Sequence, residues 1–186
     1  MIGRKLTSRL VADGHVGGRA VERLTLADVA PPQQPAPADR RVELVAADLT
    51  AQGEAERLVE SRPDLIFHLA AVVSGEAEAD FDKGYRINLD GTRALLDAVR
   101  AAHTAGGYHP RTVFTSSIAV YGSPLPNPIP EDLHHTPLTS YGTQKAIGEL
   151  LLADYTRRGL VYGIGIRLPT ISVSYTHLTL PTTPYV

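Results

Sequence analysis

The sequence has no cysteine among its 186 residues, which excludes disulfides, thiolate metal sites and cysteine nucleophiles from the residues given. It has no apolar run of about 18 residues, the length that a membrane-spanning helix requires. Excess positive charge is also missing, because 18 Lys and Arg against 20 Asp and Glu leave a net charge of −2 and no basic footprint for nucleic acid. Residues 1–14 lack the continuous apolar segment of a secretory signal. By elimination we expect a soluble cytoplasmic protein that binds neither a membrane nor a nucleic acid.

Five short apolar or β-branched runs are present, with the composition of strands buried in a parallel sheet. Between them, apolar residues recur at helical spacing. Because the two patterns alternate, the sequence predicts parallel βαβ units with helices on both faces of a sheet, an α/β doubly wound fold in one domain. The expected strands cover residues 23–29, 41–48, 64–71, 111–117 and 161–168, and the expected helices cover residues 3–13, 52–61, 79–103 and 140–157.

Both ends of the sequence depart from this pattern. The chain opens with a helical segment, although a doubly wound sheet normally begins with a strand. Residues 173–186 contain four Thr and two Pro, and they resemble the translation of a sequencing-library adaptor. The alternative is a genuine Thr- and Pro-rich edge strand. We expect residues 1–172 to form a partial domain and residues 173–186 to be a non-native tail.

Tyr141 and Lys145 lie four residues apart in the expected helix 140–157, so they share one of its faces. A phenol has an unperturbed pKa of about 10 and is a poor general base near neutral pH. A nearby ammonium lowers that pKa, which makes proton exchange with a substrate hydroxyl feasible. A Tyr-x-x-x-Lys pair standing alone is more simply explained as a solvated helix face.

The strand 111–117 adds a second feature, because it ends in the hydroxyl side chains of Ser116 and Ser117. Open parallel sheets bind ligands beyond the carboxyl ends of their strands. A serine at such an end can hydrogen-bond the reacting oxygen and orient it toward the phenol. The alternative is a pair of turn residues that satisfy local backbone groups. Counted together, Ser117, Tyr141 and Lys145 predict a catalytic site.

These residues lie within a set of motifs that resembles the extended short-chain dehydrogenase/reductase family, also called the NAD-dependent epimerase/dehydratases. The motifs occur in the family's order and at roughly its spacing, over residues 1–171. Residues 68–96 and 167–173 are most similar to the members that oxidise D-erythronate. The resemblance implies a Rossmann-type sheet and the cofactor NAD. The matching stretches are "MIG", "LADV", "AADL", "FHLAA", "INLDGT", "FTSSIAVYG", "SYGTQKAIGE" and "IRLPT".

The resemblance also implies a role for each site residue. Tyr141 would be the acid/base, and Lys145 would lower its pKa and bond the nicotinamide ribose. Ser117 would hold the substrate oxygen, and Ser74 is a further candidate substrate contact. Asp28 would accept hydrogen bonds from the adenosine ribose and repel a 2′-phosphate, which favours NAD over NADP; the alternative is a turn or helix-cap aspartate. The other expected NAD contacts, mostly through the backbone, are Ile2, Gly3, Asp48, Leu49, Leu69, Ala70, Ala71, Asn88, Ser116, Pro169 and Thr170.

No metal site is expected. His134 and His135 are adjacent but have no carboxylate companions, and His68 is expected to be a core histidine.

The largest departure from the family lies in its phosphate loop, TGxxGxxG, of which only the third glycine, Gly3, is present. In the doubly wound order 3-2-1-4-5-6, strand 1 lies between strands 2 and 4, so its absence is expected to leave two sheet edges without their shared partner. The family's substrate lobe is not expected in these residues either. We expect a fragment of poor stability and little activity, an expectation that a cooperative melt with micromolar NAD affinity would contradict.

Three functions remain open. The leading hypothesis is NAD-dependent oxidation of a hydroxyl of a small polyhydroxy acid such as D-erythronate. A nucleotide-sugar 4-epimerase of the UDP-glucose type uses the same site and returns the hydride to the opposite face. A non-catalytic dinucleotide sensor is the third, although such relatives generally lose the Tyr-Lys pair. The apolar stripe of the helix 140–157 fits either packing on the sheet or a homodimer contact in a full-length parent.

Overall fold

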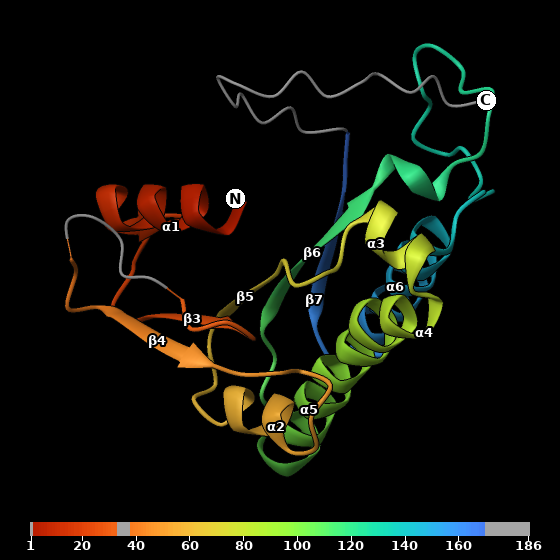
Figure 1. Ribbon diagram of the computed structural model, residues 1–186. Helices are drawn as coiled ribbons and strands as arrows, with labels where there is room; N and C mark the ends of the chain where they lie inside the picture. The colour runs from red at the N-terminus through yellow and green to blue at the C-terminus, as the bar shows by residue number, and fades with distance from the viewer. Residues whose placement is uncertain (1, 33–37, 170–186) are drawn as a thin grey trace.

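The computed structural model describes residues 2–32 and 38–169, which form parallel strands connected by helices (Figure 1). Thr170 and the segment 173–186, both singled out in the sequence, lie outside the described residues. The longer strands are β3 (Leu24–Asp28), β4 (Val42–Ala46), β5 (Leu65–His68), β6 (Arg111–Ser117) and β7 (Tyr162–Leu168). The helices are α1 (Ile2–Asp13), α2 (Glu54–Val59), α3 (Ser74–Ala79), α4 (Phe81–Gly84), α5 (Gly91–Gly106) and α6 (Ser140–Arg157), with a π-helical turn η1 (Tyr85–Asp90) and a 3-10 turn η2 (Ile118–Val120).

The five longer strands form two separate parallel sheets. One has the order β3-β4, with Leu24 opposite Val42, and the other has the order β5-β6-β7, with Leu65 opposite Arg111. No hydrogen-bonded ladder joins β3 to β5 within the described part of the chain. The strands therefore do not form the single sheet of a complete doubly wound fold. The split agrees with the two unshared edges that the sequence predicts between the second and fourth strands of the family order.

Helices α2, α5 and α6 supply the main hydrophobic core against the three-stranded sheet. Along β6 buried and half-buried residues alternate, so Phe114 points into the core while Ser117 lies on the alternate face. Gly148 brings α6 close to this strand, because an alanine Cβ there would lie 2.7 Å from Phe114 Cζ. The buried cluster comprises Ala55, Val59, Leu95, Leu96, Ala98, Val99, Tyr108, Phe114, Leu152 and Val161. Figure 1 shows α1 on the opposite side of the strands from these helices.

The stripe on α6 divides between two environments. Leu152 is buried in the core and Leu151 is half-buried against it, whereas Leu150 is 63% exposed. Packing on the sheet thus explains part of the stripe, and a homodimer contact stays a prediction.

The predicted helix 79–103 is not continuous. Asp80 has extended backbone and its side chain accepts a hydrogen bond from Lys83 N, so it ends α3 and caps α4. The π-helical turn η1 then precedes α5. The hairpin of β1 (His15–Val16) and β2 (Arg19–Ala20) was also not predicted; it turns through Gly17 and Gly18 at positive φ, which glycine adopts without a steric penalty.

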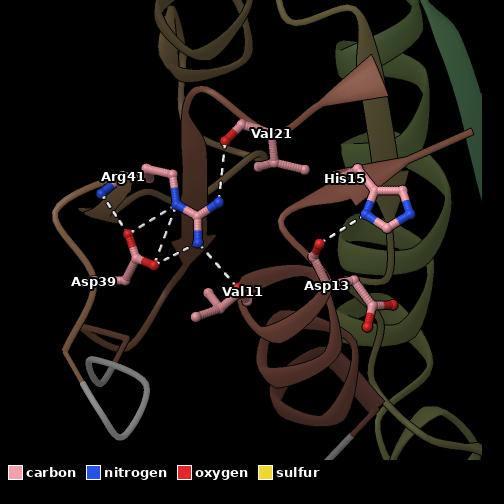
Figure 2. A network of polar contacts seen from close by, with 6 residues as sticks. All are labelled: Val11, Asp13, His15, Val21, Asp39 and Arg41. Carbon is pink, nitrogen blue, oxygen red and sulfur yellow. Dashed lines mark hydrogen bonds and ion pairs between the residues drawn. The ribbon is translucent and has the colours of Figure 1, made fainter. Parts of the chain in front are cut away.

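A partly buried ion pair between Arg41 and Asp39 connects α1 to the sheet of β3 and β4 (Figure 2). Arg41 donates to both carboxylate oxygens of Asp39, and these hydrogen bonds lower the pKa of Asp39 to about 2. The same guanidinium donates to the carbonyl oxygens of Val11, at the end of α1, and Val21, before β3. Because one side chain joins three segments, α1 is held beside β3 and β4.

Within the described residues, no helix is long and apolar enough to cross a membrane.

Candidate active site

Ser117 and Tyr141 meet where the carboxyl end of β6 faces the first turn of α6. Thr139 caps this helix, because its side chain accepts a hydrogen bond from Gly142 N at 3.0 Å. The cap places Tyr141 on the first turn, half-buried, within hydrogen-bonding reach of the Ser117 side chain. Ser117 Oγ also accepts a hydrogen bond from Ala119 N, which fixes the serine at the start of η2.

Lys145 lies one turn further along α6 and is almost completely buried. Its Nζ donates to the carbonyl oxygen of Thr115 at 2.8 Å and lies 5.7 Å from the ring centre of Tyr141. It also lies 4.9 Å from the ring centre of Phe114, a distance at which the aromatic face attracts a cation. The structure therefore brings together the three side chains that the sequence predicts as catalytic.

The electrostatics differ from the prediction in one respect. Burial raises the pKa of Tyr141, and the hydrogen bond with Ser117 opposes that rise only in part. Burial lowers the pKa of Lys145 to about 8. The expected lowering of the phenol pKa by Lys145 is thus not present in this state, because the ammonium is directed toward the Thr115 carbonyl.

Gly142 makes the close approach of α6 and the β6 loop possible. An alanine Cβ at this position would lie 2.1 Å from the carbonyl oxygen of Ala119 and 3.1 Å from Pro137. The neighbouring backbone cannot yield as a flexible side chain would. The glycine that follows Tyr141 is therefore required for the phenol to reach Ser117.

We expect Gly142→Ala to lower the free energy of unfolding by about 3 kcal/mol, the upper part of the range for overpacking, and kcat/KM of an active full-length form by at least about tenfold. Urea unfolding and steady-state kinetics measure the two effects. Gly75→Ala is the matched control, because nothing lies within 4 Å of a Cβ built there. Equal behaviour of the two variants would contradict the close-approach argument.

The residues predicted at the adenosine and pyrophosphate ends lie at the ends of their elements. Ile2 and Gly3 open α1, and a Cβ built on Gly3 would lie 3.6 Å from Leu69. Asp28 closes β3 with its side chain exposed, and one carboxylate oxygen accepts a weak hydrogen bond from Ala30 N. Ala70 and Ala71 follow β5, Ser74 begins α3, and Pro169 follows β7.

Other predicted residues have side chains already engaged elsewhere. Asp48 accepts hydrogen bonds from Thr50 N and Oγ1, which lower the pKa of its carboxyl. Leu49 packs against the core. Ser116 is buried on the opposite face of β6 from Ser117, beside Glu149, and its hydroxyl helps to lower the pKa of that carboxyl. Contacts of these residues with NAD would have to involve the backbone.

Histidine 68 is a core residue, as the sequence indicates. Its Nε2 lies 2.8 Å from Thr92 Oγ1, and because the Thr92 hydroxyl donates to Asn88 O, the histidine nitrogen is the donor in this pair. Complete burial, with a smaller contribution from Lys145, lowers the pKa of His68 to about 4. Among residues 2–32 and 38–169, no group of three or more His, Asp or Glu side chains is placed to hold a metal ion.

A polar cluster beside the site was not predicted. Glu149 accepts hydrogen bonds from Arg167 on β7: Nε lies 3.1 Å from each carboxylate oxygen, and Nη2 lies 2.8 Å from Oε2. Arg167 also contacts the Tyr121 hydroxyl and His135 Nε2, so α6 is tied to both ends of the loop after β6. Burial is the largest single influence and raises the pKa of Glu149, but the hydrogen bonds from Arg167 and Ser116 and the charges of Arg167 and His135 together outweigh it, so the pKa lies below its ordinary value. The four-residue spacing of Glu149 from Lys145 is the one sequence feature that indicates its position.

A cavity of about 910 Å³ lies beside this cluster, and Ser117, Tyr141 and Lys145 are not among its lining residues. It is open and has Tyr121, Glu149, Leu152, Gly165 and Arg167 among its lining residues. The candidate site is therefore identified by the convergence of Ser117, Tyr141 and Lys145, and not by the volume of a cavity.

Parallel strands connected by helices form an α/β fold of the Rossmann type, which solved epimerase structures share over about half of their length. Residues 1–179 match the NAD dependent epimerase/dehydratase family, and the chain belongs to this family.

The relatives include both dehydrogenases and epimerases. D-erythronate dehydrogenase of Cupriavidus necator is 53% identical over 83% of this chain and 46% of that protein, and the enzyme of Haemophilus influenzae is 40% identical over 92% and 52%. The solved structure of the nucleoside-diphosphate-sugar epimerase from Agrobacterium tumefaciens is 69% identical, with a TM-score of 0.88 over 91% of this chain and 50% of that one. UDP-glucose 4-epimerase from Brucella ovis in complex with NAD is 30% identical, with a TM-score of 0.73 over 90% and 48%. The chain spans about half the length of the curated relatives it matches.

The residues present fit NAD, the cofactor on which the family depends. Asp28 offers an exposed carboxylate for a ribose diol, and the first turn of α1 offers backbone N–H groups and a positive dipole end for phosphate. Lys145 has donors beyond the one it gives to the Thr115 carbonyl.

Proposed function

We propose that the protein to which these residues belong oxidises a hydroxyl group of a small polyhydroxy acid of the D-erythronate class. The observation that carries the proposal is the convergence of Ser117, Tyr141 and Lys145 at one strand end. The choice of substrate class is supported by the two D-erythronate dehydrogenases at 53% and 40% identity.

In this mechanism Ser117 donates to the substrate oxygen and orients it toward Tyr141, whose phenolate removes the hydroxyl proton. Bound NAD would supply the hydride acceptor. Lys145 must turn from the Thr115 carbonyl toward the phenol or a ribose hydroxyl, because only then does its charge favour the phenolate. Gly142 and the cap at Thr139 keep the phenol on the first turn of α6 during this exchange.

The test uses a chimera in which residues 1–169 of this chain are joined to the parts of the Cupriavidus necator D-erythronate dehydrogenase that lie outside the match. NADH absorbance is followed with D-erythronate and related acids. Net NADH formation is expected. A folded chimera that binds NAD and forms no NADH with any of these acids contradicts the proposal.

An epimerase of nucleotide sugars is the second candidate, favoured by the 69% identity to the structure from Agrobacterium tumefaciens. Conversion of UDP-glucose to its 4-epimer without net NADH would support it. Absence of turnover in both assays, with NAD affinity retained, would support a dinucleotide sensor.

A further inference from the structure

Two buried amide side chains join α6 to the turn that follows β5. Asn88 Oδ1 accepts a hydrogen bond from Val72 N at 2.8 Å, and Asn88 Nδ2 donates to Val72 O at 3.2 Å. The same Nδ2 donates to Gln144 Oε1 at 2.8 Å. Asn88 is 1% exposed and Gln144 is 0% exposed. The backbone of Val72 is therefore held, through Asn88, by the residue that precedes Lys145.

The direction of each amide follows from the backbone. Val72 N–H can only donate, so the oxygen of Asn88 must face it, and the Asn88 nitrogen must then face the oxygen of Gln144. This leaves Gln144 Nε2 at the far end, buried and without a hydrogen-bond partner.

The space around that nitrogen is small. A Cβ built on Gly84 would lie 2.8 Å from Gln144 Nε2 and 3.0 Å from Ala77 Cβ. A buried amide N–H group without a partner costs about 1–3 kcal/mol, more than the about 0.5–1.5 kcal/mol that a hydrogen bond normally contributes. Stability alone therefore does not explain a glutamine at position 144, since an apolar side chain of equal length would avoid the penalty.

A second polar link joins α6 to α3, the helix that follows this turn. Glu78 on α3 accepts a hydrogen bond from Ser140 N, the residue before Tyr141. The segment from Val72 to Glu78, which contains the candidate substrate contact Ser74, is thus attached to α6 at both of its ends. The two attachments lie on either side of Tyr141 along the chain.

We propose that Gln144 is a positioning residue, which sets the placement of the Val72–Ser74 turn relative to the phenol of Tyr141 and so aligns the polyhydroxy acid for oxidation. The inference rests on the proposed function. Asn88 connects Gln144 to the backbone of Val72, and Glu78 attaches the other end of the segment from Val72 to Glu78 to α6. Gln144 itself contacts no substrate.

The test compares Gln144→Met with the parent chimera. Methionine preserves length and apolar volume but removes the acceptor for Asn88 Nδ2. We expect kcat/KM for D-erythronate to fall about tenfold, mostly through KM, while NAD affinity changes less than about twofold. The Val72 amide should exchange its hydrogen about tenfold faster, with the core amide of Val99 unchanged. Gln144→Glu, which keeps an oxygen for Asn88, should restore most of the KM.

Leu152→Met is the matched control, because it replaces a buried α6 residue without touching Val72. It should leave all of these quantities unchanged. Three results overturn the proposal: an unchanged Val72 amide in Gln144→Met, a parallel loss of NAD affinity, or loss of a cooperative melt, which would make the glutamine a folding residue. If the parent chimera oxidises no acid, the proposed function fails, and the Val72 exchange rate still decides whether Gln144 holds the turn.

Discussion

Replacement of Tyr141 by Phe in the chimera is expected to lower kcat by about 10²–10⁴-fold, the contribution of a positioned acid/base group. The substitution removes the phenolic oxygen near Ser117 and retains the ring, which lies 5.7 Å from Lys145 Nζ. Single-turnover kinetics with saturating NAD and acid measure the loss directly.

The control for this substitution is Tyr155→Phe on the same helix. The Tyr155 hydroxyl donates to Asp97 Oδ1 at 2.7 Å, away from the candidate site. It should change kcat by less than about twofold, and both variants should retain the parent's NAD affinity. A Tyr141→Phe enzyme with kcat near the parent value would mean that another group moves the proton.

Replacement of Lys145 by Met is expected to remove catalysis and yet stabilise the protein at pH 7 by about 3 kcal/mol. The pKa of this buried amine is lowered by desolvation to about 8 from an ordinary value of 10.5. Holding the charged amine therefore costs free energy in the folded protein, whereas the solvated amine of the unfolded chain carries its charge at no such cost. Methionine keeps the stem in the core and removes that cost.

The stability advantage of Lys145→Met should depend on pH. Below pH 8 lysine is charged in both states, so the full penalty of burying the charge acts on the folded protein. From pH 8 to 10.5 the folded protein has released the proton and the unfolded chain still holds it, so the advantage of methionine should shrink and vanish near 10.5. Urea unfolding across this range, without NAD, measures it. The exposed Lys5→Met is the control, and a pH-independent advantage would contradict the electrostatic explanation.

The pattern of strands and the three catalytic candidates could be predicted because each depends on local spacing. Tyr141 and Lys145 share a helix face, and Ser117 ends a short β-branched run that predicts a strand. The direction of the pKa shift of Tyr141 could not be predicted from the sequence. It depends on burial and on the position of Lys145, whose ammonium donates to the carbonyl of Thr115, 30 positions away in the chain. Gln144 was missed for the same reason, since its partner Asn88 lies 56 positions away.

The division of the helical region before α5 shows a further limit. Hydrophobic spacing extends through residues 79–103, but the extended backbone of Asp80 and the π-helical turn η1 interrupt the helix. The π-helical turn η1 packs against α6 and contains Asn88, whose side chain bonds the backbone of Val72. No local propensity encodes a π-helical turn of this kind.

The split between the two sheets bears on how a dinucleotide would be held. Asp28 belongs to the body built on β3 and β4, whereas Ser117 and Tyr141 belong to the body built on β5, β6 and β7. A dinucleotide that reached both would therefore span two sheets that no hydrogen-bonded ladder joins among the described residues. Its affinity would depend on how these two sheets are placed relative to one another, whereas the adenosine end alone would need only the sheet of β3 and β4.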